Sequence, residues 1–268
     1  MRPAQGTPDR EGVDELAGHS KWANRVHRKT RQDKKRSKTF SKYSRAIMVA
    51  AREGGGNPDH NPTLRSLIDQ ASTAEMPKDN IEYAIKRGLG EVEGVEFEAV
   101  RYEGYGPGGV AMLVECVTDN NQRTVAEIRN VMGKRDGKMS GAGSVTWMFE
   151  QKGVITVPRS EVDLDDVFLI AAEAGAEDIV EDDEDYWEVR TAMEDFHTVR
   201  EALSDEDIPI ERAELAMIPT STVDVPDGEA KKLLGLLEDL DDHDDVQNVY
   251  ANFEVSEEAL EQYEASTN

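Results

Sequence analysis

The sequence has a single cysteine, few aromatic residues and no long hydrophobic run. Cys116 is the one cysteine among 268 residues, which excludes a disulfide framework and a cysteine-based zinc site. The longest apolar run, Val110–Val114, is far shorter than the roughly 18 residues that a membrane span needs. Met1–Ala17 contains no apolar stretch of the kind that a secretory signal requires. We therefore expect a cytoplasmic protein.

Basic residues become scarce after the first third of the chain. The net charge is −25, but His19–Arg52 holds twelve basic residues and one acid, whereas residues 161–268 hold five basic residues and 35 acids. This split predicts a polyanion-binding end on a self-repelling body. The alternative is that the basic helix packs against an acidic part of its own chain. We expect the acidic tracts Glu181–Asp185 and Asp241–Asp245 to be solvated surface.

The spacing of apolar residues predicts helices first, and strands alternating with helices afterwards. Between Lys21 and Arg87 the pattern indicates three amphipathic helices. The first ends at Gly54, the second is capped by Asn61, and the third runs from Pro77 to Gly88. Residues 154–218 then show the order β-α-β-β-α-β, the split unit of a ferredoxin-like sheet.

The same order is found a second time if residues 110–150 are joined to 221–254, with strands at Ser144–Glu150 and Val223. Two consecutive smaller units are the alternative. The predicted fold class is α+β, with an N-terminal three-helix domain followed by two ferredoxin-like α+β domains, one inserted into the other. In chain order, the expected parts are a disordered extension (1–18), a basic helical domain (19–93), a discontinuous α+β domain (94–153 and 219–256), an inserted acidic α+β domain (154–218) and an acidic tail (257–268).

No motif for catalysis or metal binding is evident. Gly104–Gly109 matches the G-x-G-x-x-G pattern of dinucleotide sites, but a strand is predicted to follow it where such a site needs a helix. A tight turn between strands is therefore favoured. The five histidines lack metal-ligand spacing, and Cys116 is expected to be a buried small hydrophobe. We accordingly expect no enzyme activity, no cofactor and no metal.

The basic stretch from Lys21 to Arg45 is the candidate nucleic-acid-binding segment, since lysine and arginine neutralise phosphates and release counterions. An exposed Trp22 could stack on a base, with burial as its alternative, whereas Tyr43 lies on an apolar stripe and is expected in the core. No helix-turn-helix reader is recognisable, so the pattern does not support sequence-specific recognition. The candidate contact residues are Lys21, Trp22, Arg25, Arg28, Lys29, Arg31, Lys34, Lys35, Arg36, Lys38, Lys42 and Arg45.

Several blocks of the sequence together resemble the YebC/PmpR family, over nearly the whole chain from Ala17 to about Phe253. They are Ala17–Asn24, His27–Lys29, Met76–Asp79, Tyr102–Gly109, Thr118–Asn120 with Arg123–Glu127, and Gly143–Val145. The resemblance implies a helical N-terminal domain and two α+β domains, one interrupting the other. It also implies a DNA-binding transcriptional regulator. The family's mitochondrial relatives act as translational activators, and some bacterial members resemble ribosome-associated factors that help translation through proline-rich stretches.

We predict a non-enzymatic, nucleic-acid-binding regulator of gene expression that acts on DNA. The alternative is a ribosome-associated translation factor that binds ribosomal RNA, which the lack of a recognisable base-reading helix favours. The expected partner is nucleic acid, or the ribosome in the alternative, with no membrane; the oligomeric state is open. Leu16 stands where the family would have its initiator methionine, so we expect translation to begin at codon 16, without Met1–Glu15.

Overall fold

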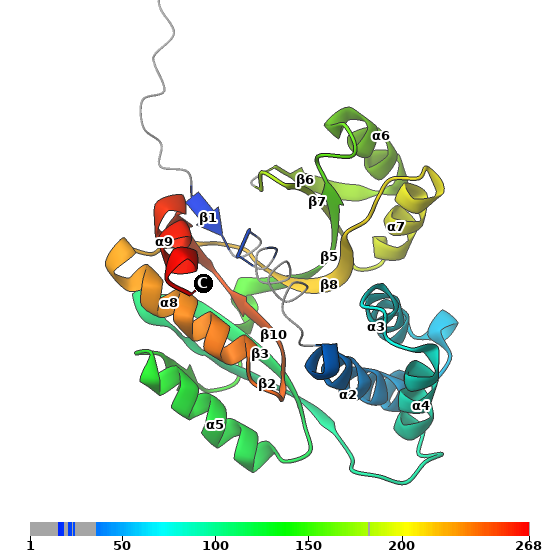
Figure 1. The fold of residues 1–268 in the computed structure, drawn as a ribbon, viewed down its shortest axis with the longest axis horizontal. Coiled ribbons are helices and arrows are strands. Elements are labelled where there is room, and N and C mark those ends of the chain that lie inside the picture. The colour runs from blue at the N-terminus through cyan, green and yellow to red at the C-terminus, as the bar shows by residue number, and fades with distance from the viewer. Residues whose placement is uncertain (1–15, 19–20, 23, 25–35, 182, 268) are drawn as a thin grey trace, which may run out of the picture.

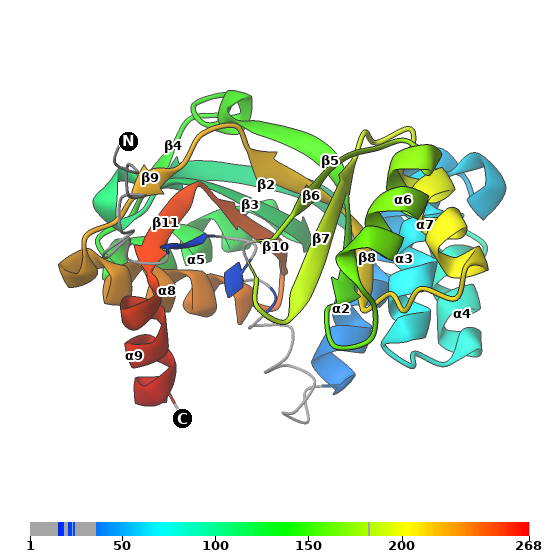
Figure 2. The same ribbon diagram turned by 90° about the horizontal axis from the view of Figure 1, so that it is seen from above.

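The computed structural model describes residues 16–18, 21–22, 24, 36–181 and 183–267. It has a mixed α+β architecture in which a group of helices precedes antiparallel sheets with their own helices (Figure 1). The N-terminal helices lie beside the second of two four-stranded sheets, at one end of the molecule (Figure 2). Among the residues described, no helix combines the length and the apolar character that a membrane span requires.

The N-terminal helices form a small bundle, the helical head, whose boundaries follow the sequence signals. Its members are α2 (Arg36–Gly54), the short turn η1 (Pro58–His60), α3 (Pro62–Thr73) and α4 (Lys78–Gly88). Asn61 caps α3 by accepting the Leu64 N–H at 3.0 Å, and its side-chain amide donates to the Ala50 carbonyl at 2.8 Å. Ile47, Leu64 and Ile81, one from each helix, are buried together. The three predicted helices are confirmed.

The first four-stranded sheet is antiparallel and has the order β10-β3-β2-β4. Its strands are β2 (Glu98–Tyr105), β3 (Ala111–Thr118), β4 (Lys138–Ser140) and β10 (Val246–Ala251). Two helices, α5 (Asn121–Lys134) and α8 (Asp227–Asp241), cover one face of it (Figure 2). Met112, Ile128 and Leu233, from β3, α5 and α8, are fully buried in the core between them.

The glycine-rich segment Gly104–Gly109 connects β2 to β3 as a tight turn, through η2 (Pro107–Gly109). The Gly106 N–H donates to the Val110 carbonyl at 2.8 Å and closes the turn. Gly108 and Gly109 have φ values of +74° and +76°, in the left-handed region that favours glycine. Because a strand follows, the turn offers no helix N-terminus to a pyrophosphate.

The second four-stranded sheet is also antiparallel and has the order β6-β7-β5-β8. In chain order its elements are β5 (Phe149–Pro158), α6 (Leu164–Ala174), β6 (Ala176–Val180), β7 (Tyr186–Thr191), α7 (Phe196–Asp205) and β8 (Arg212–Pro219). This combination of chain order and strand order is the ferredoxin-like arrangement, so the predicted split unit is confirmed. Ile155, Val189 and Phe196 are fully buried in its core.

The first sheet does not have the ferredoxin-like arrangement that we expect for this part of the chain. β2 lies beside β3, β4 forms the edge, and the expected strand at Ser144–Glu150 is a loop and the turn η3 (Thr146–Met148) leading into β5. Val223–Asp224, which is β9, pairs with β11 in another sheet. The chain nevertheless leaves the first sheet after β4 and returns to it at β10, so the second sheet is inserted. The domain boundaries themselves stay a prediction.

A third sheet pairs a strand at the start of the described chain with a strand close to its C-terminal end. Its strands are β1 (Leu16–Gly18), β11 (Phe253–Ser256) and β9, in the order β1-β11-β9. The expectation of disorder over residues 1–18 is therefore wrong for Leu16–Gly18, which pairs antiparallel with β11; Met1–Glu15 lies outside the described residues. The expected acidic tail is the helix α9 (Glu257–Thr267), anchored by the buried Leu260.

A buried carboxylate fixes the loop that links the two four-stranded sheets. Glu103 on β2 is 6% exposed and accepts backbone N–H groups from Gly143 at 2.7 Å, Val145 at 2.7 Å and Thr146 at 3.0 Å. Burial alone would raise the pKa of this carboxyl, but the hydrogen bonds outweigh it and lower the pKa from 4.5 to about 2. The loop is therefore held by the charged form of Glu103.

Replacing this carboxylate should destabilise the fold in a pH-dependent way. We expect Glu103→Gln to lower the free energy of unfolding by about 2 kcal/mol at pH 7, since hydrogen bonds to a charged group are lost. The folded pKa lies below the unfolded one, so the contribution is complete above pH 4.5 and is lost as the pH falls toward 2. Urea unfolding at several pH values measures it.

The matched control is Glu98→Gln, at an exposed position of the same strand. It should change the free energy of unfolding by less than about 0.5 kcal/mol. An equal loss in both variants, or a loss at Glu103 that does not shrink at low pH, would contradict the assignment.

Candidate nucleic-acid interface

One face of α2 carries three of the candidate contact residues, Lys38, Lys42 and Arg45. All three are partly buried, with side-chain exposures of 28%, 18% and 24%. Each contacts the acidic turn (Asp241–Asp245), which joins the end of α8 to β10. The prediction that this tract is solvated surface is therefore wrong for Asp245, which is buried, whereas Asp242 and Asp244 are exposed. For α2, the structure shows a basic helix packed against an acidic part of the same chain.

The lysines of α2 bind the C-terminal end of α8. Lys42 donates to the Asp241 carbonyl at 2.8 Å, and Lys38 donates to the Asp242 carbonyl. The last carbonyls of a helix lack partners within it and carry its negative end, and α8 has no basic residue in its own last turn. Burial lowers the pKa of Lys42, and the attraction of Asp241 offsets this only in part. Lysines from a distant helix thus cap α8.

Asp245 is the most enclosed member of the acidic turn, at 4% exposure. Its carboxylate accepts hydrogen bonds from Arg45 at 3.0 Å, from Arg123 at 2.8 Å and from Thr124 at 2.7 Å. Burial would raise the pKa of this carboxyl, but the hydrogen bonds from Arg123 and Thr124 and the attraction of both arginines lower it. The charged carboxylate therefore connects α2 and α5 to the start of β10.

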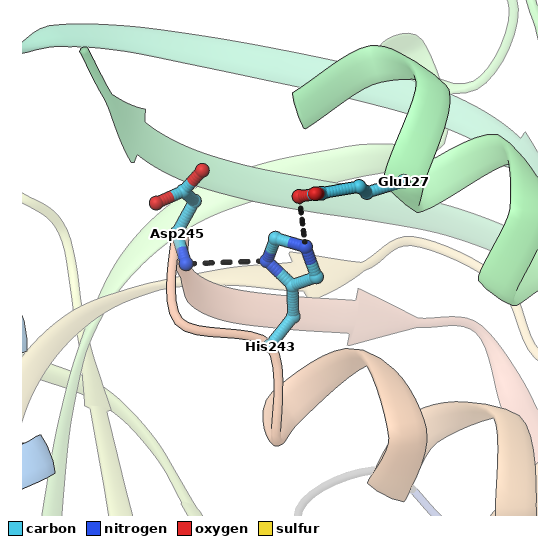
Figure 3. A group of neighbouring side chains, drawn as sticks. All are labelled: Glu127, His243 and Asp245. Atoms are coloured by element: carbon cyan, nitrogen blue, oxygen red, sulfur yellow. Dashed lines mark hydrogen bonds and ion pairs between the residues drawn. The ribbon is translucent and has the colours of Figure 1, made fainter. Parts of the chain in front are cut away.

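Figure 3 shows Glu127, His243 and Asp245. Each offers one atom that could bind a metal ion, and these three atoms lie within 4.8 Å of one another. His243 Nε2 lies 3.0 Å from the Glu127 carboxylate, and its Nδ1 lies 3.2 Å from the backbone N–H of Asp245, which fixes the tautomer. Both ring nitrogens are therefore engaged, as are the Asp245 oxygens. A metal ion would have to replace these hydrogen bonds, so the three residues fit a hydrogen-bonded contact better than a metal site.

The other candidate contact residues fall into three groups. Lys21 is 5% exposed and pairs with Glu257, and Trp22 is 6% exposed and packs in the core of the first sheet. The indole of Trp22 is therefore not available for stacking on a base. Arg36 begins α2, but its side chain is not described. The remaining six lie outside the described residues: Arg25, Arg28, Lys29, Arg31, Lys34 and Lys35.

A cleft of about 670 Å³ lies between the helical head and the two four-stranded sheets. Its walls mix charges of both signs, including Arg101 and Arg212 with Glu115 and Glu214. Cys116 lines part of it but is buried, and burial raises the pKa of its thiol to about 12. The expected role of Cys116 as a buried hydrophobe is confirmed, and the thiol is not an activated nucleophile.

Sequence reasoning missed the carboxylates that matter most to this arrangement. The acidic turn follows an apolar helix and precedes a strand, and nothing within that segment distinguishes it from a solvated loop. The signal that could have found it is the row of cations on α2 at spacings of four and three residues. Cations that border the apolar stripe of a packed helix lie near the protein core, where another part of the chain can supply their acidic partners.

The chain matches two family models in succession. Residues 20–91 match the TACO1/YebC protein N-terminal domain, and residues 97–253 match the TACO1/YebC second and third domain. A protein of Persephonella marina is 53% identical over 247 residues, which cover 92% of this chain and 99% of the relative. One from Natranaerobius thermophilus is 50% identical over 249 residues, with coverage of 92% and 99%. Both carry the name "Probable transcriptional regulatory protein".

A solved structure agrees with the fold. The crystal structure of a conserved hypothetical protein from Aquifex aeolicus has a TM-score of 0.77 and 46% sequence identity, and the match covers 84% of this chain and 93% of that one. The two family models together span both the helical head and the two sheets. The chain belongs to the TACO1/YebC family of regulatory proteins.

Proposed function

We propose that the protein is a non-enzymatic regulator that binds DNA through its basic N-terminal segment and acts on transcription. The observation that carries the proposal is the segregation of charge, with twelve basic residues and one acid between His19 and Arg52 in a chain of net charge −25. Six of these cations lie between Arg25 and Lys35. The names of the relatives support a role in transcription.

The contacts of α2 support phosphate binding by the same face. Lys38, Lys42 and Arg45 already hold a series of carboxylate and carbonyl oxygens along one side of the helix. Phosphate oxygens are acceptors of the same kind, and arginine and lysine bind both. Nucleic acid that reached this face would have to displace the acidic turn. The acidic turn therefore competes with phosphates and limits binding to strands that also engage the rest of the basic segment.

The affinity for duplex DNA should depend steeply on salt. If the six cations between Arg25 and Lys35 contact phosphates, the logarithm of the binding constant should fall with the logarithm of salt concentration at a slope near −5. The double variant Lys34→Gln, Lys35→Gln should make the slope shallower by about 2. Fluorescence anisotropy with a labelled duplex at several salt concentrations measures both.

The control is the double variant Lys134→Gln, Lys231→Gln, which removes two exposed lysines from the first sheet's helices. Its slope should equal that of the unchanged protein. A slope near zero in the unchanged protein would refute phosphate binding, and an equal change in both variants would refute the location.

Weakening the acidic turn should strengthen binding. Asp242 and Asp244 are its most exposed members, with side-chain exposures of 51% and 76%, and both pair with Lys38. We expect the double variant Asp242→Asn, Asp244→Asn to raise duplex affinity about fivefold, since each exposed pair contributes up to about 1 kcal/mol. Asp205→Asn with Glu206→Gln, exposed at the end of α7, changes the net charge equally and should have less than a twofold effect. Equal gains in both would mean that only net charge matters.

The target is identified by crosslinking in cells, followed by sequencing of the attached DNA and RNA. We expect discrete DNA peaks upstream of genes, because the relatives are named as transcriptional regulators. Peaks confined to ribosomal RNA would replace this proposal with the translation factor. Loss of crosslinks in the Lys34→Gln, Lys35→Gln variant is the expected control result.

A further inference from the structure

Trp147 is the most exposed large hydrophobic side chain among the described residues, at 71%. It lies in η3, in the loop that links the two four-stranded sheets. Its indole N–H donates to the Ser144 carbonyl at 3.1 Å, so the polar edge of the ring is satisfied within the loop. The flat apolar faces are what the side chain presents to its surroundings. Exposed, oriented aromatic rings of this kind mark binding surfaces more often than scattered aliphatic residues do.

Tyr105 lies beside Trp147, and Lys138 lies beside Tyr105. The hydroxyl of Tyr105 lies 3.4 Å from the Ser144 carbonyl that also accepts the Trp147 indole N–H. Tyr105 is 37% exposed, and it is directly opposite the exposed Lys138 in the ladder of β2 and β4. Side chains that face each other across antiparallel strands project on the same side of the sheet. Within the described chain, no carboxylate forms an ion pair with Lys138.

The loop beneath Trp147 is fixed before any partner arrives. Glu103 accepts the backbone N–H groups of Gly143, Val145 and Thr146, the residues that precede Trp147. Val145 is fully buried and anchors the loop in the core. An aromatic side chain on such a support loses little conformational entropy when it binds.

The charge of this surface differs from that of its surroundings. After residue 89 the two longest stretches without an acidic residue are 137–149 and 104–114, in a part of the chain that holds 45 acids. The pairing of β2 with β4 brings these two stretches together at Tyr105 and Lys138. Gly141 and Gly143 lie beside them, with open space where side chains would be. The two stretches themselves contribute no carboxylate that would repel a polyanion.

We propose that Tyr105, Lys138 and Trp147 form a platform on which one unpaired nucleotide of a bound nucleic-acid strand stacks. The base lies on the indole of Trp147, and the ammonium of Lys138 contacts the adjoining phosphate. This inference rests on the proposed nucleic-acid binding, to which it adds a second contact that is far from α2 along the chain. Base stacking on aromatic rings tolerates any sequence, because every base has a π face. A protein partner is less well matched, because the exposed apolar area is limited to the rings of Trp147 and Tyr105 and its flanks are glycine and lysine.

The test compares a single-stranded 20-nucleotide oligo(dT) with a 20-base-pair duplex, using the full chain. We expect Trp147→Ala to weaken binding of oligo(dT) roughly tenfold and to leave duplex affinity within about twofold. Trp147→Phe should restore most of the loss, because the ring is kept. Phe168→Ala is the matched control, since Phe168 is 59% exposed on the acidic helix α6. It should change neither affinity.

Tryptophan fluorescence gives a second readout that a purely structural role would not affect. Trp22 is buried and the ring of Trp187 lies 3.7 Å from the Arg159 guanidinium, so Trp147 is the ring most open to a base. Oligo(dT) should quench the emission of the unchanged protein and not that of Trp147→Phe. Unchanged oligo(dT) affinity in Trp147→Ala, or equal quenching in both proteins, would overturn the platform. Failure of the unchanged protein to bind either oligo(dT) or the duplex would refute the proposed function instead.

Discussion

The placement of the helical head depends on the buried carboxylate of Asp245. It accepts hydrogen bonds from Arg45 on α2 and from Arg123 and Thr124 on α5, while its own backbone leads into β10. Breaking a buried pair leaves an uncompensated charge, so each partner constrains the others. The Asp245 carboxylate therefore joins the head, through Arg45, to the first sheet and to α5.

Some of the acidic residues of the chain have a structural role in this contact. A net charge of −25 keeps the body soluble and repels polyanions, but part of that acid is already used to hold the basic helix α2. Lys38 and Lys42 are closest to the negative end of α8, where backbone carbonyls and carboxylates act together. The same cations cannot serve the protein's own carboxylates and a phosphate backbone at once. The proposed nucleic-acid binding at α2 therefore requires release of the acidic turn.

A buried, charged carboxylate also holds the loop between the two four-stranded sheets. Glu103 accepts three backbone N–H groups from one loop, which a neutral side chain could not do as well. That loop determines where β5 begins and how Trp147 is presented. Conformation and surface chemistry at this point thus depend on one buried charge.

Local signals in the sequence were enough to predict the N-cap of α3, the C-terminal end of α2, both ends of α4, the turn at Gly104–Gly109 and the β-α-β-β-α-β order of the second sheet. These signals act over a few residues, through periodicity, capping and glycine conformation. The folded chain was needed to show which carboxylates meet α2, that Trp22 is buried, and that β2 lies between β3 and β4. Arg45 and Asp245 are 200 positions apart, and whether two charges so distant are solvated or paired depends on the topology that brings them together.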